Sequence, residues 1–157
     1  MRRGSSASAA RRLAQLPWAD RALLAEAAVL LALARLAVVL VPFRVIARRL
    51  GPRMAETPRV DAVEPERLRR LTWAIAAVAR RTPWRSQCLE QALAAKAMLR
   101  RRGIASTLYL GVARGAAGAP RPFDAHAWLR SGTVHVTGGA GAGRYAVVAT
   151  FADPPAA

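Results

Sequence analysis

The spacing of apolar side chains changes near the middle of the chain. From about residue 17 to residue 102, apolar side chains recur at helical spacing, which predicts three main helices. After Gly103, short runs alternate between apolar and polar side chains, which predicts strands. Helices followed by a series of antiparallel strands are typical of an α+β domain. We therefore expect N-terminal helices, then a helix packed on an antiparallel β-sheet.

The first helix contains the most apolar stretch, residues 22–43. Asp20 is expected to cap its start and Pro42 to end or kink it. Glu26 and Arg35 interrupt the stretch and lie about 180° apart on a helix, so one polar stripe cannot hide both. Each would cost roughly 2.5–3.5 kcal/mol near the centre of a bilayer. We expect a helix packed on the domain or on a partner; a membrane-surface or spanning helix is the alternative.

Two further helices and their boundaries follow from local signals. One is expected from Pro65 to Arg81, and the next from Gln87 to Arg102. Ser86 is the expected N-cap of the later helix, and Gly103 is expected to end it.

The strand expected at 123–130 has two distinct faces. Its alternation places Phe123, Ala125, Ala127 and Leu129 on one face, and Asp124, His126 and Trp128 on the other. A turn at 131–132 leads into a strand at 133–137, and the last strand covers 144–151. The glycine-rich segment 138–143 lacks the Lys-Ser/Thr pair and the helix of a phosphate loop, so we interpret it as a turn.

Composition narrows the classes of partner. The net charge is +16, and 24 of the 25 basic residues are Arg. They are scattered along all segments without interleaved aromatics, which argues against nucleic-acid binding. An acidic peptide, an acidic protein or an anionic membrane surface fits the charge as well. Arg35 interrupts the apolar core that a cleaved signal peptide needs, so cytoplasmic residence is expected.

The single cysteine, Cys88, lies in the first turn of the third expected helix. One Cys allows no internal disulfide, and with two His it is too few for a zinc site, so neither a metal nor a cofactor is expected. The N-terminal end of a helix stabilises a thiolate, and its N–H groups can receive an oxyanion. A buried structural cysteine is the alternative.

A base for this thiol must come from one of two histidines. His126 lies in the middle of a strand, and a helix-borne Cys with a sheet-borne His is the papain type of arrangement. His135, on the next strand, is the rival. The candidates for orienting the imidazole are Asp124, Thr137 and Asp153. Asp124 is two residues from His126, roughly 6.6 Å along a strand, which is awkward for a direct hydrogen bond.

Several blocks of sequence stand in a recognisable order. They are Pro83-Trp84-Arg85-Ser86-Gln87-Cys88-Leu89-Glu90-Gln91-Ala92-Leu93-Ala94, Leu99-Arg100-Arg101-Arg102-Gly103-Ile104-Ala105, Leu110-Gly111-Val112 and Phe123-Asp124-Ala125-His126-Ala127-Trp128-Leu129. They resemble the lasso-peptide biosynthesis leader peptidase family, part of the transglutaminase-like superfamily. Leu16-Pro17-Trp18 and Val41-Pro42-Phe43-Arg44 are similar to the helical N-terminal part of its stand-alone members, so the resemblance covers about residues 15–151.

The resemblance implies a cysteine protease that removes the leader from a ribosomally made precursor. It implies Cys88 as nucleophile, His126 as base, and an oxyanion site made by the Cys88 N–H with the Gln87 side chain; Asp124 is the candidate third residue. The superfamily usually has an acid on the next strand, but residues 136–139 contain no carboxylate, so Thr137, a main-chain carbonyl or Asp124 must orient the imidazole.

The resemblance also implies partners and domain limits. The expected divisions are a disordered basic N-terminus at 1–14, a helical region at 15–58 and a transglutaminase-like protease domain at 59–153. The first 60 residues do not read as a leader-recognition domain, which implies a separate recognition protein beside an asparagine-synthetase-like cyclase. The apolar helix and the Arg-rich surface are possible docking surfaces for these partners. A non-catalytic partner-binding module of the same fold and a membrane-associated basic protein are the alternatives.

Overall fold

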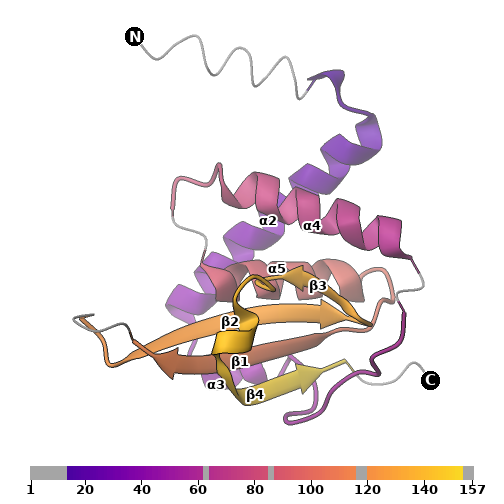
Figure 1. The fold of residues 1–157 in the computed structure, drawn as a ribbon. Helices are drawn as coiled ribbons and strands as arrows, with labels where there is room; N and C mark the ends of the chain where they lie inside the picture. The colour runs from indigo at the N-terminus through magenta and orange to yellow at the C-terminus, as the bar shows by residue number, and fades with distance from the viewer. Residues whose placement is uncertain (1–13, 62–63, 85–86, 116–119, 154–157) are drawn as a thin grey trace.

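The computed structural model describes residues 14–61, 64–84, 87–115 and 120–153 (Figure 1). Its helices are α2 (Trp18–Leu40), α3 (Phe43–Ala47), α4 (Pro65–Ala79), α5 (Cys88–Arg100) and the short 3₁₀ helix η1 (Ala142–Arg144). Its strands are β1 (Thr107–Arg114), β2 (Phe123–Ser131), β3 (Val134–Thr137) and β4 (Ala146–Ala152). The expected α+β class, with a helix packed on an antiparallel sheet, is confirmed.

The helices form layers over one side of the sheet (Figure 1). α5 packs on β2 and β3, and α4 packs on α5 and β3. α2 packs mainly on α4 and α5 rather than on the strands. The shared core contains Leu31 from α2, Leu71 from α4, Leu99 from α5 and Leu129 from β2. The position of α5 is therefore fixed from both sides, by the sheet and by the other helices.

The four strands are antiparallel neighbours in the order β3-β2-β1-β4. Leu108 pairs with Leu129, and both side chains enter the core beneath α5, so they define the helix-facing side of the sheet. Tyr109 pairs with Trp128 on the other side, and their rings stack at 5.3 Å. We call this second side the outer face of the sheet. The alternation expected for 123–130 is confirmed by this register.

Gly111 is required by the crowding on the outer face. A Cβ at this position would lie 2.8 Å from the Trp128 ring and 2.8 Å from the Tyr145 Cβ. Only glycine lets the indole lie flat against the strand.

Two expected N-caps are wrong. α2 is preceded by Pro17 and has no side-chain cap; the carboxylate of Asp20 pairs instead with Arg70 of α4. The N-cap of α5 is Gln87, whereas Ser86 lies outside the described residues. In both cases the helix begins at a slightly different residue from the one that capping preference alone favours.

The expected helix ends are confirmed within two residues. α2 ends at Leu40, and Pro42 is the N-cap of the separate helix α3. After α5, Gly103 takes a left-handed φ of 67°, and the Ile104 N–H donates to the Leu99 carbonyl at 3.0 Å. This turn directs the chain back into β1.

The two charges inside the apolar stretch are both paired with α5 or the turn after it. Glu26 binds Arg102 at 2.6 Å, and Arg35 binds the buried Glu90 at 2.9 Å. They lie at the two edges of a buried stripe formed by Ala27, Leu31 and Ala34. The expectation that this helix packs on the domain is confirmed for the described residues.

Candidate functional site

Cys88 is the first residue of α5. Its side chain is partly buried and packs against the core cluster beneath the helices. The thiol therefore stands at the positive end of the helix dipole, as the sequence predicted.

The residues around Cys88 form a capping box. The Gln87 side chain accepts from the Glu90 N–H, and the Glu90 carboxylate accepts from the Gln87 N–H at 3.2 Å. These bonds use the first and fourth N–H groups of the helix end and do not involve those of Cys88 and Leu89. A backbone oxyanion site at Cys88 is therefore compatible with the cap. The expected oxyanion role of the Gln87 side chain stays a prediction, since its oxygen serves the cap.

His126 lies in the middle of β2, and a main-chain carbonyl holds its ring. Its Nε2 lies 2.7 Å from the Gly138 oxygen. A carbonyl only accepts hydrogen bonds, so Nε2 carries the proton in the neutral ring and Nδ1 keeps the lone pair of a base. The ring also contacts Tyr145 at 4.9 Å and Trp128 at 5.8 Å. Of the orienting groups considered from the sequence, the structure supplies a main-chain carbonyl.

Cys88 and His126 belong to two elements that pack together, α5 and β2. His126 pairs with Gly111 and belongs to the outer face of the sheet, whereas α5 covers the helix-facing side. Within the described parts of the chain, no hydrogen bond or ring contact of His126 involves Cys88. Their pairing as nucleophile and base stays a prediction.

Asp124 contacts His126 only indirectly. Its carboxylate accepts from the Tyr145 hydroxyl at 2.7 Å and lies 3.4 Å from an Arg144 nitrogen. The hydrogen bond to Asp124 raises the pKa of Tyr145. Because the Tyr145 ring lies against His126, Asp124 is linked to the imidazole through Tyr145. Its role as third catalytic residue stays a prediction.

The other two candidates for the third residue lie apart from the imidazole's hydrogen bond. Thr137 is buried, and its hydroxyl has no hydrogen-bond partner among the described residues. The Asp153 carboxylate binds Lys96 at 3.0 Å and the Ser106 hydroxyl at 2.8 Å, near the C-terminal half of α5. Asp153 therefore serves another part of the molecule.

A cavity of about 390 Å³ is lined by residues that neighbour Cys88 and His126. Gln91, one helical turn after Cys88, lines it together with Gly138, whose carbonyl holds His126. The unpartnered hydroxyl of Thr137 belongs to the same lining, as does the rival base His135. The remaining lining residues are Thr72, Ile75, Ala76, Val136, Gly139 and Ala140. This cavity is the candidate substrate site.

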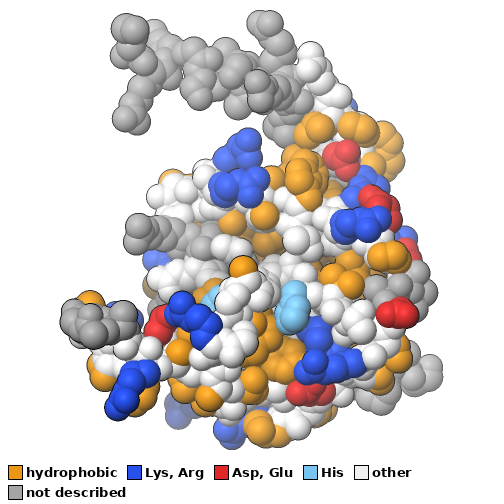
Figure 2. All heavy atoms as spheres, in the orientation of Figure 1, with side chains coloured by type: hydrophobic (Ala, Val, Ile, Leu, Met, Phe, Trp, Pro, Cys, Tyr) orange, Lys and Arg blue, Asp and Glu red, His pale blue; other side chains and the backbone are white. Residues whose placement is uncertain are grey.

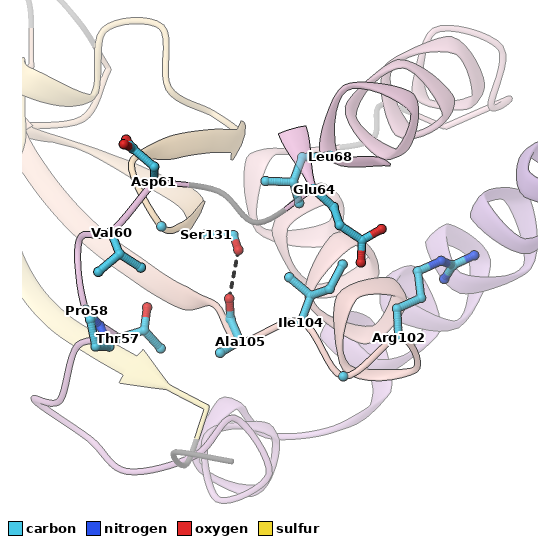
Figure 3. A pocket seen from close by; sticks show the side chains of 12 residues that line it. Thr57, Pro58, Val60, Asp61, Glu64, Leu68, Arg102, Ile104, Ala105 and Ser131 are labelled. Atoms are coloured by element: carbon cyan, nitrogen blue, oxygen red, sulfur yellow. Dashed lines mark hydrogen bonds between the residues drawn. The ribbon is translucent and has the colours of Figure 1, made fainter. Parts of the chain in front are cut away.

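A second cavity, of about 320 Å³, lies at the other end of α5 (Figure 3). Leu68 of α4 and Ile104 border it, and Ser131 donates to the Ala105 carbonyl at 2.8 Å in its wall. The 13 residues of α5 span about 20 Å, so this cavity is remote from Cys88.

Buried charges, which the sequence pattern did not predict, anchor that same end of α5. Lys96 is buried and pairs with Asp153, which also accepts from Arg100. Burial alone would raise the pKa of Asp153, but the hydrogen bond from Arg100 and the charge of Lys96 lower it below its ordinary value. That Lys96 is the only lysine was a possible hint, although its partner lies 57 positions away.

The distribution of basic side chains and the arrangement of possible metal ligands bear on nucleic-acid binding and metal binding. Figure 2 shows Lys and Arg side chains spread in separate groups over the visible face rather than in one stripe. Among the described residues, no group of three or more His, Cys, Asp or Glu side chains is arranged to hold a metal ion.

The comparisons with known proteins give one match. Residues 37–150 match the family described as Transglutaminase-like superfamily. No curated protein matches the sequence, and no solved structure matches the fold. The matched region begins inside α2, includes Cys88, His126 and the strands β1 to β3, and ends inside β4. Since it covers well over half of the sequence, the chain belongs to the transglutaminase-like superfamily, which includes cysteine peptidases.

Proposed function

We propose that this protein is a cysteine peptidase that removes the leader from a lasso-peptide precursor. The observation that carries the proposal is the position of Cys88 at the N-terminal end of α5, within a domain of a superfamily that includes cysteine peptidases. The sequence blocks around Cys88 and His126 support the narrower choice of a leader peptidase through their resemblance to that family.

The proposed reaction needs no group beyond protein and water. The Cys88 thiol gives its proton to His126 Nδ1, and the thiolate attacks the carbonyl carbon at the leader–core junction. The Cys88 N–H, with Gln87, stabilises the oxyanion. The C–N bond then breaks, and the core amine takes the proton from the imidazolium. Water, deprotonated by His126, hydrolyses the thioester and releases the leader carboxylate and the thiol.

The proposal includes a closing step, because the reaction needs the imidazole of His126 in contact with the Cys88 thiol and no hydrogen bond joins them among the described residues. β3 pairs with β2 only from Leu129 to Ser131, so the segment containing His126 is paired along one edge, with β1. We propose that substrate binding beside the cavity lined by Gln91 and Gly138 shifts this segment and brings the imidazole to the thiol.

The partners and the location are part of the same proposal. The chain would work in the cytoplasm with a precursor peptide, a separate leader-recognition protein and an asparagine-synthetase-like cyclase, and without nucleic acid. The net charge of +16 favours acidic segments in the peptide or in these proteins.

A non-catalytic partner-binding module of the same fold is the second candidate. The observation that favours it is the position of His126 on the outer face of the sheet, away from α5. Such a module would bind its partners with no use for the thiol.

Cleavage of the precursor encoded in a neighbouring reading frame distinguishes the two candidates. The precursor is incubated with its recognition protein and either the wild-type chain or Cys88→Ala. The masses of the products are then measured by mass spectrometry. The peptidase proposal predicts a free leader only with the wild-type chain, while circular dichroism shows that both fold equally. Leader removal by Cys88→Ala at the wild-type rate would overturn it. Partner binding by both chains without any cleavage would favour the non-catalytic module.

A further inference from the structure

α2 has two apolar faces, of which the domain covers only one. Ala27, Leu31 and Ala34 are buried. About 180° around the helix lie Val29, Leu33, Leu36 and Leu40, which are 58%, 54%, 53% and 72% exposed. Trp18, 76% exposed, falls on the same side. We call these five side chains the exposed α2 stripe. A helix that is apolar all round is normally covered on all sides.

The exposed α2 stripe contains no charged side chain, because the charged residues of α2 lie elsewhere on the helix. Glu26 is held by Arg102 and Arg35 by Glu90, at the two edges of the buried face. Asp20 pairs with Arg70 of α4. From Ala22 to Leu40, no charged side chain therefore enters the exposed stripe.

The helix is suited to lie on a membrane rather than to cross one. α2 is long and apolar enough to span a bilayer by length and composition. Spanning, however, would require it to leave the buried core and break four ion pairs with the rest of the domain. Lying flat buries only the exposed stripe and keeps every one of these contacts.

The charges near the exposed α2 stripe indicate which kind of membrane surface it would contact. Between residues 18 and 53 the only acids are Asp20 and Glu26, and both are paired with arginines. Arg21 is exposed in the first turn of α2, and Arg44 and Arg48 are exposed just after its end. A second copy of this chain, also at +16, would bring like charges together, whereas anionic headgroups complement them.

We propose that the exposed α2 stripe, with the arginines at the two ends of the helix, docks the protein on an anionic lipid surface. Figure 1 shows α2 as a long helix crossing behind α4 and α5. Its axis would lie parallel to the membrane, with the four aliphatic side chains at the level of the headgroups and upper acyl chains. The proposal is independent of the peptidase activity, so Cys88→Ala is expected to bind lipid like the wild-type chain.

Vesicle flotation tests the proposal on the full chain. The vesicles are phosphatidylcholine alone or a 3:1 mixture of phosphatidylcholine and phosphatidylglycerol. The test variant is Leu33→Gln/Leu36→Gln. The matched control is Val147→Gln/Val148→Gln, which replaces two similarly exposed apolar side chains on β4. Wild type and control are expected to float with the mixed vesicles and much less with phosphatidylcholine. The test variant is expected to bind at least ten-fold more weakly.

Three results would overturn the proposal. The first is equal lipid binding by the test variant and the control in 0.15 M and 0.5 M salt, because adsorption of a basic protein would then explain all binding. The second is no binding to the mixed vesicles. The third is a dimer, or a complex with a partner protein, that Leu33→Gln/Leu36→Gln abolishes while lipid binding is unchanged.

Discussion

The two ends of α5 differ in how they are held. At the C-terminal half, buried Lys96 and the neighbouring Arg100 share the Asp153 carboxylate, which also accepts from Ser106. At the N-terminal end, the cap joins Gln87 to Glu90, while the thiol of Cys88 rests at the edge of the core without a polar partner among the described residues. One end fixes the helix on the sheet, and the other carries the proposed nucleophile.

Because of this difference, variants at one end of α5 are expected to change the stability of the domain, and variants at the other end are expected to change the proposed reaction. Variants at the C-terminal half are expected to unfold the domain without any direct effect on the reacting atoms. Variants at Cys88 or its base are expected to stop the reaction in a folded chain. The predictions below test this separation, from the largest expected effect to the smallest.

Replacing the base is expected to have the largest effect. His126→Gln should reduce leader removal by roughly 10³-fold or more, because loss of one member of a catalytic set has consequences of this size. His135→Gln is the comparison variant, because His135 is the rival base, exposed on β3 and part of the lining of the candidate substrate cavity. Cleavage is measured under single-turnover conditions. If His135→Gln loses activity while His126→Gln keeps it, the assignment of the base is wrong.

Breaking the buried ion pair between Lys96 and Asp153 is expected to destabilise the domain strongly. Asp153→Ala leaves the ammonium of Lys96 buried without its carboxylate, which typically costs about 3–5 kcal/mol. Urea unfolding measures the loss. The double variant Lys96→Met/Asp153→Leu removes both charges and should recover much of the stability. A single variant as stable as the wild type would show that this end is not the anchor.

The same carboxyl group predicts the acid sensitivity of the fold. The pKa of Asp153 is lowered in the folded chain, so its contribution to stability is complete above the ordinary carboxyl range and disappears as the pH falls through the folded-state pKa. Glu26 acts in the same direction, since the hydrogen bond from Arg102 lowers its pKa. The free energy of unfolding should therefore decrease steadily from about pH 5 downward. Asp153→Asn should show a shallower decrease, and an identical slope would contradict the assignment.

The cap at the N-terminal end predicts the smallest effect. Gln87→Ala removes one side-chain hydrogen bond of the capping box, which is worth about 1 kcal/mol. The loss is measured by urea unfolding and should be well below that of Asp153→Ala. Leader removal should slow more than this stability change explains if Gln87 also stabilises the oxyanion. A change in stability alone would confine Gln87 to the cap.

Much of this fold could be predicted from local sequence. Apolar spacing gave α4 and α5, Gly103 gave the turn into β1, and alternation gave the two faces of β2. The pairs Arg35–Glu90 and Lys96–Asp153 could not be predicted, because their members are more than 50 residues apart and meet only through packing.

The candidate site shows the same division between local and long-range information. The position of Cys88 at a helix start was predicted from its neighbours, and the polar face of His126 followed from alternation. The expectation that the two side chains meet came from the combination of a helix-borne Cys with a sheet-borne His and from the resemblance, and it stays a prediction. The sequence placed His126 opposite the apolar face on which a helix packs, and the strand register confirms that face.

The most direct test of the central claim uses Cys88 as the only thiol in the chain. The rate of its alkylation by iodoacetamide at pH 6.5 is measured in the wild-type chain and in His126→Gln, each alone and with the leader peptide and its recognition protein. Our account predicts equal alkylation rates for the two chains when each is alone. Once the leader is bound, it predicts that the wild-type thiol is alkylated at least ten-fold faster than the thiol of His126→Gln. Equal rates for the two chains in the leader-bound state would contradict the pairing of Cys88 with His126.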